Sequence, residues 1–429
     1  MAQQTPWAIL ACKWSDMPNE AKSIGFLEQM FTKNGRGTQN MVDFFDDNSH
    51  GNVDTGDSRV FGWLTLPKKW SDYKGSGANP QGRQDLMNWA RQAAIDAGID
   101  LTPFFNVVVC MNASATQGTD LFGGGSGVVC DTNVLQASVI AQEMGHGYGL
   151  DHSRQDGSSA DYMDRWDVMS TWDSCFMEPN TDYVLIGPGL NAANMEGRGW
   201  LDESRVWSSG STSFDTTIQL RPLHRRDLPG FLAARLGNYL VEFRSKDRWD
   251  VAIPRSAVLV HRFEDNHSYI MSANDGAQDL VAGSTFGDNP ANNKFRIFGS
   301  FTTLEVTEIS DAGQFATIRL EHSVRAIPQV GPGILFGGVA SDGGGWIFIA
   351  GKFVPVPPRS PLIAILEQIA VYESANTIQQ SQVRESVRRE ALSSILRATN
   401  RQLSSMLTFT QPAPLKKQEG QASTKNRRG

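Results

Sequence analysis

Five residues between positions 142 and 152 have the types and spacing of a catalytic metal site. In the run QEMGHGYGLDH, Gln142 and His146 are four residues apart, so in a helix their side chains share one face, with Glu143 beside it. Gly149 can end the helix in a left-handed conformation and turn the chain back, so that His152 approaches the same point as His146. Three protein ligands with an open position for water are the arrangement of a catalytic zinc site.

The same run resembles the zinc-binding signature of the metzincin proteases, HExxHxxGxxH, with Gln142 in place of the first His. These proteases also have a methionine beneath the metal, and the segment WDVMS places Met169 17 residues after His152. Other segments resemble, in the same order, the immune inhibitor A type of bacterial metallopeptidase: 40–45 (NMVDFF), 49–51 (SHG), 199–202 (GWLD), 239–244 (YLVEFR), 249–250 (WD), 253–254 (IP) and 258–261 (VLVH). The resemblance covers roughly residues 7–320.

This resemblance implies a zinc-dependent endopeptidase that acts on protein or peptide substrates. His146 and His152 would bind the zinc ion, with Gln142 as the third candidate ligand. Glu143 would be the general base that takes a proton from the water activated by the metal and passes it to the leaving amine. Met169 would pack beneath the site without taking part in the chemistry.

The glutamine at position 142 leaves alternatives open. An amide oxygen is a poorer zinc ligand than imidazole, so we expect weaker zinc binding than three histidines would give. The alternative is that Gln142 does not bind the metal and that Asp151, His50 or a water completes the ligand set. The alternative function is a catalytically impaired metzincin scaffold that binds protein or glycan, and a third is a hydrolase of another bond at the same metal site. The family's tyrosine near the methionine is missing at 170–172, which leaves Tyr162 as a candidate to stabilise the oxyanion.

Alternating strands and helices position these residues. The sequence predicts buried strands at 7–13, 59–66, 104–110 and 127–130, and helices at 83–97 and 133–147, the latter capped by Asp131 or Thr132. Gly98 is expected to end the first helix, and the glycines at 123–125 to form a turn or a rim over the substrate cleft. This order predicts an α/β catalytic domain over residues 1–202.

After residue 202 the pattern changes to short alternating runs separated by turns. They lie at 216–223, 238–245, 256–263, 301–309 and 315–322, and they predict a β-sandwich domain over 203–325. Residues 326–410 should form a hairpin plus a helical extension, with helices at 361–373 and 382–407. The second of these helices would dock on the body or mediate self-association, and the basic tail at 411–429 should be disordered. The fold class is therefore α+β.

Composition narrows the possible functions further. The formal net charge of −7 argues against a basic nucleic-acid-binding protein, and no apolar run is long enough for a transmembrane segment. The first residues do not resemble a signal peptide, although the family resemblance suggests a secreted protein. Four cysteines are too few for a disulfide framework, and we expect Cys110 and Cys130 to be buried thiols, with a bridge as the alternative. The acidic cluster at 43–57 indicates a solvated loop, or less readily a Ca²⁺ site.

Overall fold

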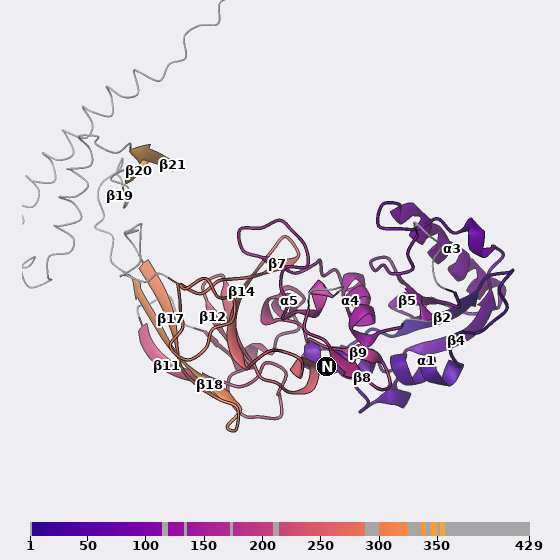
Figure 1. Cartoon of the computed structure of the whole chain (residues 1–429), viewed down its shortest axis with the longest axis horizontal. Helices are drawn as coiled ribbons and strands as arrows, with labels where there is room; N and C mark the ends of the chain where they lie inside the picture. The colour runs from indigo at the N-terminus through magenta and orange to yellow at the C-terminus, as the bar shows by residue number, and fades with distance from the viewer. Residues whose placement is uncertain are drawn as a thin grey trace, which may run out of the picture. The chain divides into compact units, whose positions relative to one another are not determined.

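The computed structural model combines sheets and helices, as the sequence predicts, and the region before residue 325 contains the candidate site (Figure 1). The described residues are 2–113, 119–132, 135–171, 175–208, 214–287, 300–324, 336–339, 345–349 and 352–356. One compact unit comprises Met1–Asn289 and Phe301–Val324, and a second comprises Pro290–Ser300 and Arg325–Gly429. Among the described residues, no helix has the length and apolar character needed to cross a membrane.

The first sheet is parallel and has the strand order β4-β2-β5-β6. Its strands are β2 (Trp7–Lys13), β4 (Arg59–Thr65), β5 (Asn106–Met111) and β6 (Val128–Asp131), each within two residues of its predicted position. Strands buried on both faces need continuous apolar runs, which explains sequences such as WAILACK. Cys110 and Cys130 pair across β5 and β6 as free buried thiols with their sulfur atoms 3.4 Å apart.

Helices cover both faces of this sheet (Figure 1). Alternate residues of β2 point to opposite sides, so Ala8 and Leu10 pack with helix α3 (Pro80–Asp96), whereas Ile9 packs with the other helices. Those helices are α1 (Ile24–Phe31), α2 (Met41–Asn48), α4 (Ala137–Gly147) and α5 (Ala192–Gly197). Helix α3 begins three residues before its predicted start because Pro80 occupies its first turn, and it ends as predicted before Gly98, whose φ is +77°.

The predicted cap of α4 is wrong. Asp131 continues strand β6 opposite Met111, and the hydroxyl of Thr132 donates to the Met111 carbonyl group, so neither side chain is available to a helix. The N-cap residue is Gln136, which makes no side-chain capping hydrogen bond. Every α4 residue from Ala137 to Gly145 is buried, so tertiary packing holds this helix in place of a cap.

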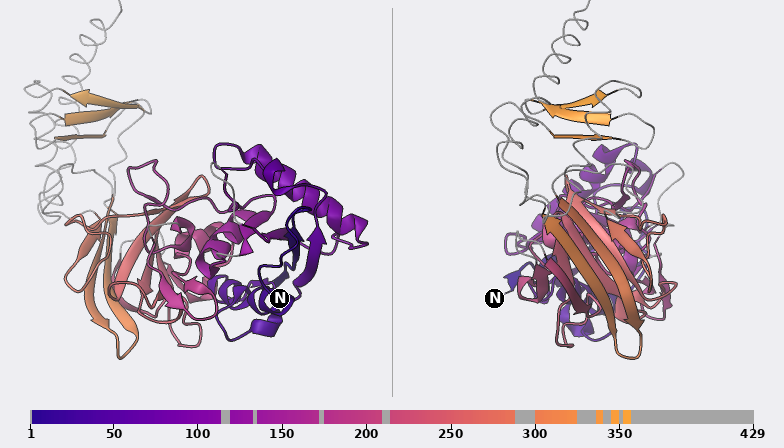
Figure 2. Two further views of the ribbon diagram at one scale, coloured as in Figure 1. Left: turned by 45° about the vertical axis from the view of Figure 1, so that its right-hand side comes forward. Right: turned by 90° about the vertical axis from the view of Figure 1, so that its left-hand side faces the viewer.

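Two further sheets enclose a hydrophobic cluster that contains Val241, Val258, Leu304 and Ile318. One has the order β10-β12-β13-β14-β15-β7, with β10 (Val206–Ser208), β12 (Ala233–Leu236), β13 (Tyr239–Arg244), β14 (Ala257–Glu264), β15 (His267–Ile270) and β7 (Arg154–Gln155). The other has the order β11-β18-β17-β16, with β11 (Phe214–Leu220), β18 (Phe315–Val324), β17 (Ser300–Ser310) and β16 (Thr285–Gly287). In the right-hand view of Figure 2, the second of these sheets lies in front of the first.

Three smaller sheets complete the described structure. Strand β1 (Gln3–Gln4) pairs with β3 (Val53–Asp54), and β8 (Glu178–Asn180) pairs with β9 (Val184–Ile186). In the second unit, β19 (Phe336–Val339), β20 (Gly345–Ile349) and β21 (Lys352–Val356) form an antiparallel sheet, in agreement with the predicted hairpin. The helices predicted at 361–373 and 382–407 and the predicted tail at 411–429 lie outside the described residues.

Candidate metal centre

The end of helix α4 turns the chain back on itself, as the glycine pattern predicts. Gly149 has a φ of +86°, its N–H group donates to the His146 carbonyl group (2.9 Å), and the N–H group of Leu150 donates to Gly145 (3.1 Å). A side chain is disfavoured at this φ, so glycine is required for so sharp a reversal. The reversal brings His152 back beside His146.

The imidazole rings of His146 and His152 meet through their Nε2 atoms, which are 3.1 Å apart. The Nδ1 atom of His146 lies 2.7 Å from the carbonyl oxygen of Leu150, and the Nδ1 atom of His152 lies 3.2 Å from a carboxylate oxygen of Asp161. Both acceptors require a proton on Nδ1, so in the neutral rings each Nε2 atom carries a lone pair. Two lone pairs that face each other at this distance repel unless a cation lies between them.

Burial keeps both rings neutral. It lowers the pKa of His146 to about 4, with a further contribution from His152. Burial also lowers the pKa of His152, although Asp161 opposes the shift. A neutral imidazole with its second nitrogen bound to an oxygen acceptor is the form in which histidine binds a metal.

Glu143 lies in the same turn of α4 as His146 and is buried, with 7 % of its surface exposed. Burial raises the pKa of Glu143 to about 7, while the Arg83 guanidinium lowers it and Asp120 raises it. A general base works best when its pKa lies near the working pH. Glu143 therefore has the environment of a proton-transfer residue.

Gln142 is buried in the same turn of α4. Its Oε1 atom, an acceptor, has no hydrogen-bond partner. Buried acceptors without partners are uncommon and require an explanation such as a bound ion.

These atoms fit a zinc ion. Two nitrogen ligands of a tetrahedral zinc ion lie ~3.3 Å apart, close to the observed separation of the two Nε2 atoms. Among the described residues no three His, Cys, Asp or Glu side chains form a metal-binding group, so within this part of the chain a third protein donor would be another kind of atom. The Oε1 atom of Gln142 and the hydroxyl group of Tyr162 are the candidates.

Tyr162 packs against the imidazole ring of His152. Its hydroxyl oxygen lies 2.9 Å from the Nε2 atom of His152, and the centres of the two rings are 4.1 Å apart. The φ of Tyr162 is +63°, which is uncommon for a residue with a bulky side chain. The prediction that Tyr162 serves the site therefore agrees with where its hydroxyl group lies.

Met169 is completely buried beneath α4. It lies in the short 3-10 helix Val168–Ser170, which begins where Asp167 accepts a hydrogen bond from the N–H group of Met169 (2.8 Å). A β-carbon on Gly145 would lie 2.6 Å from the Met169 sulfur atom. Met169 thus supports the turn of α4 that carries Gln142 and His146.

The glycine loop at 123–125 packs on the same turn of α4 from outside. A β-carbon on Gly124 would lie 2.2 Å from the backbone oxygen of Glu143 and 2.7 Å from the β-carbon of His146. The absence of a side chain at Gly124 thus allows the loop to lie directly on the helix. Of the two roles predicted for this loop, a rim of the site agrees better with this contact.

The two alternative ligands considered from the sequence lie elsewhere. His50 is buried, its Nε2 atom bonds to the Leu223 carbonyl group (2.9 Å), and its Nδ1 atom accepts from the N–H group of Asp202 (3.1 Å). Both ring nitrogens are therefore occupied, and the prediction that His50 is an alternative metal ligand is wrong. The carboxylate of Asp151 is half exposed and lies 3.8 Å from the Nε2 atom of His267, rather than at the His146 ring.

The acidic cluster at 43–57 also has protein partners. Asp46 pairs with Arg226, and Asp47 pairs with Arg248 and accepts from the Trp249 indole. The remaining members, Asp43, Asp54 and Asp57, accept from backbone N–H groups or pair with Lys33 and Arg36. These contacts argue against a Ca²⁺ site at this cluster.

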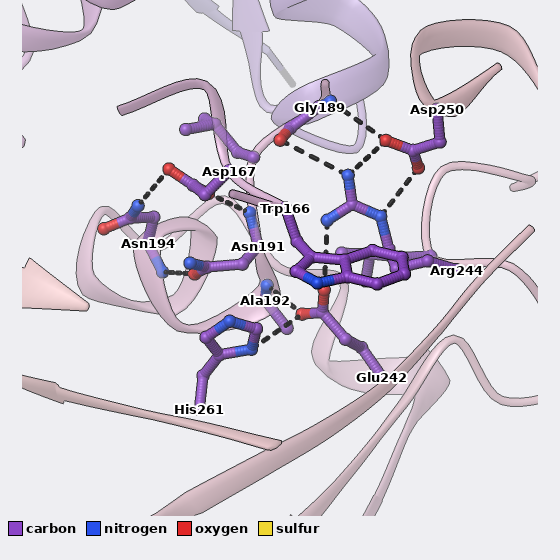
Figure 3. Close-up of polar contacts among 12 residues, drawn as sticks. Trp166, Asp167, Gly189, Asn191, Ala192, Asn194, Glu242, Arg244, Asp250 and His261 are labelled. Carbon is purple, nitrogen blue, oxygen red and sulfur yellow. Dashed lines mark hydrogen bonds and ion pairs between the residues drawn. The ribbon is translucent and has the colours of Figure 1, made fainter. Parts of the chain in front are cut away.

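A buried network of charged and polar residues includes Asp167, which directly precedes the 3-10 helix that carries Met169 (Figure 3). Arg244 forms ion pairs with Glu242 and Asp250, and all three side chains are at most 5 % exposed. His261 pairs with Asp164 (3.0 Å), and Asp167 accepts hydrogen bonds from Ser153, Asn191 and Asn194. The sequence analysis did not identify this network, because its members come from six separate segments.

The sequence analysis did not identify Asp161, whose carboxylate contacts His152. Asp161 precedes Tyr162 directly and lies nine residues after His152, in a loop with no regular spacing that would point to the histidine.

The chain matches none of the family models, curated proteins or solved structures with which it was compared. The account of the site therefore depends on its geometry.

Proposed function

We propose that the protein is a zinc-dependent endopeptidase whose metal ligands are His146 and His152, with Gln142 as third ligand and Glu143 as general base. In this proposal the first sheet and its helices form a metzincin-like catalytic domain, followed by a β-sandwich domain and the small hairpin and helical extension. The substrates are proteins or peptides. The observation that carries the proposal is the 3.1 Å approach of the Nε2 atoms of His146 and His152. The Oε1 atom of Gln142, one helical turn before His146, is buried without a hydrogen-bond partner.

The residues of the chain have distinct tasks in this reaction. Zinc, when bound, supplies an electrophile that acidifies water and polarises the scissile carbonyl group. Glu143 takes the proton of the attacking water and delivers it to the leaving amine, and its buried carboxylate is suited to both steps. The hydroxyl group of Tyr162, 2.9 Å from His152, is available to donate to the developing oxyanion.

The proposal is tested by hydrolysis of unfolded casein by the full-length protein loaded with zinc. Glu143→Gln keeps the shape of the side chain but removes the base, so we expect activity to fall by ~10²-fold or more with zinc still bound. The matched control is Glu178→Gln, a change at an exposed residue of strand β8, which should retain full activity. Wild-type hydrolysis by the Glu143→Gln variant would contradict the mechanism.

One observation favours the alternative function. At the candidate site the described residues supply two histidines but no third His, Cys, Asp or Glu ligand. Such a site suits weakened metal binding on a scaffold that binds protein or glycan. This alternative expects no casein hydrolysis by the wild-type protein, even with zinc in excess. The casein assay therefore separates the two functions.

A further inference from the structure

We propose that Asp161 is a positioning residue for His152. Arg154 and Tyr269 hold Asp161 in place, so that the sheet containing β7 and β15 fixes the geometry of the metal site. This inference rests on the proposed function, because it assigns a role toward the same metal ion. It concerns three residues that the sequence motif does not contain.

The segment that carries His152 is bound to the β14–β15 hairpin. Strand β7 pairs with β15 in parallel, with Arg154 opposite Tyr269. On the other side of His152, the N–H group of Asp151 donates to the carbonyl group of Asn266 (3.1 Å). The Nδ1 atom of His267 also lies 2.7 Å from the His152 carbonyl oxygen. The backbone of His152 is therefore held by the hairpin on both sides.

The side chains continue this connection to the imidazole ring. One oxygen of Asp161 accepts from the Nδ1 atom of His152 (3.2 Å), and the other accepts from the Nε atom of Arg154 (2.8 Å). The Nη1 atom of Arg154 in turn donates to the hydroxyl group of Tyr269 (3.4 Å). The contacts thus run from Tyr269 through Arg154 and Asp161 to His152.

These contacts set the tautomer and the orientation of the His152 ring. The carboxylate fixes the proton of His152 on Nδ1, which leaves Nε2 free to face the Nε2 atom of His146. The Asp161 side chain is 38 % exposed, so without Arg154 it could rotate into water. His146 needs no such support, because its Nδ1 atom binds a backbone carbonyl group. Of the two histidines, His152 is therefore the one that depends on side chains held by the sheet containing β7 and β15.

Zinc affinity, measured by competition with a chelator, tests the proposal on the full-length protein. Loss of an outer carboxylate partner typically weakens metal binding 10–100-fold. We expect a loss of this size for Asp161→Ala and a smaller loss for Arg154→Met. Asp161→Asn should recover part of the affinity, because its amide oxygen can still accept from Nδ1.

Arg262→Met is the matched control. Arg262 stacks on the ring of the same Tyr269 (4.3 Å) and pairs with Asp156, but it makes no contact with Asp161. We expect zinc affinity within twofold of wild type for this variant. Wild-type affinity for Asp161→Ala, or an equal loss for Arg262→Met, would overturn the proposal.

The tautomer of His152 gives a second readout that needs no metal. In nitrogen NMR spectra of the zinc-free protein, we expect the Nδ1–H form of His152 in the wild type and a mixture of tautomers in Asp161→Ala, with His146 unchanged. An unchanged His152 spectrum in Asp161→Ala would refute the positioning role. If the wild type binds no zinc but shows this tautomer shift, the proposed function fails and the positioning role stands.

Discussion

The sulfur atom of Met169 lies so close to Gly145 that a β-carbon on this glycine would be only 2.6 Å from it. Met169 is completely buried and cannot move into solvent. The glycine at position 145, one residue before His146, therefore leaves room for the Met169 side chain beneath the turn of α4 that carries the candidate ligands. This contact connects the methionine predicted from the sequence with the helix that carries the candidate ligands.

Gly145→Ala should destabilise the protein. The added methyl group overpacks the space above Met169, and such overpacking typically costs ~1–3 kcal/mol in the free energy of unfolding. Urea unfolding measures this change. The matched control is Gly25→Ala in helix α1, where a β-carbon meets nothing closer than 4.0 Å, so that the unfolding free energy should stay equal or rise. Equal stabilities for both variants would show that the contact with Met169 does not constrain α4.

Arg244→Met should be strongly destabilising. It leaves the carboxylates of Glu242 and Asp250 buried without their cation, a change that typically costs ~3–5 kcal/mol. Arg319→Met removes a similar bidentate pair with Asp215, but that pair is exposed, so its loss should have no measurable effect. Thermal unfolding of the two variants gives the comparison, and a small effect of Arg244→Met would contradict the role of the network.

Stability should fall at alkaline pH because of His261. Burial lowers its pKa, but Glu242 and Asp164 outweigh this effect and raise the pKa above its ordinary value. A histidine whose pKa is raised in the folded protein contributes stability fully below the unfolded value of about 6.5, and loses it as the pH rises through the folded value.

Urea unfolding over a pH series measures the effect of His261. The wild type should lose stability between about pH 6.5 and the folded pKa, and His261→Gln should lack this part of the slope. The variant will also be less stable throughout, because Asp164 and Glu242 lose their partner. The same alkaline slope in both proteins would mean that another group is responsible.

Local geometry explains why part of the site could be predicted from the sequence. The four-residue spacing of Gln142 and His146 and the turn at Gly149 are properties of a single helix end, and they place His152 correctly. Asp161 and Arg154 could not be found in this way, because their contacts depend on how the loop after His152 meets strand β15.

The fold likewise could be predicted where local sequence patterns determine it, but not where long-range packing does. Strands of the first sheet follow from continuous apolar runs, whereas the pattern of residues 239–244 (YLVEFR) assigns Glu242 and Arg244 to an ordinary polar face. The packing of this part of the chain buries both residues, and no local pattern indicates it. The N-cap of α4 is a similar case, because long-range pairing of β6 takes up Asp131.

Gln142→His should tighten zinc binding at least tenfold. The new imidazole would lie one helical turn from His146, and imidazole is a better zinc ligand than an amide oxygen. Changes outside the metal's first shell already alter affinity by about tenfold or more, so a change of ligand should do at least as much. Chelator competition measures the affinity, and rates at saturating zinc separate occupancy from catalysis. Equal affinity in both proteins would remove position 142 from the ligand set.

Zinc binding by the wild type and by the variants His146→Ala and His152→Ala shows whether the two histidines hold a metal ion. Equilibrium dialysis of the full-length protein, followed by metal analysis, gives the stoichiometry and the affinity. We expect one zinc ion per chain in the wild type and in Glu143→Gln, and an affinity at least tenfold weaker after loss of either histidine. A wild type that binds no zinc, or histidine variants that bind it equally well, would rule out the proposed metal site.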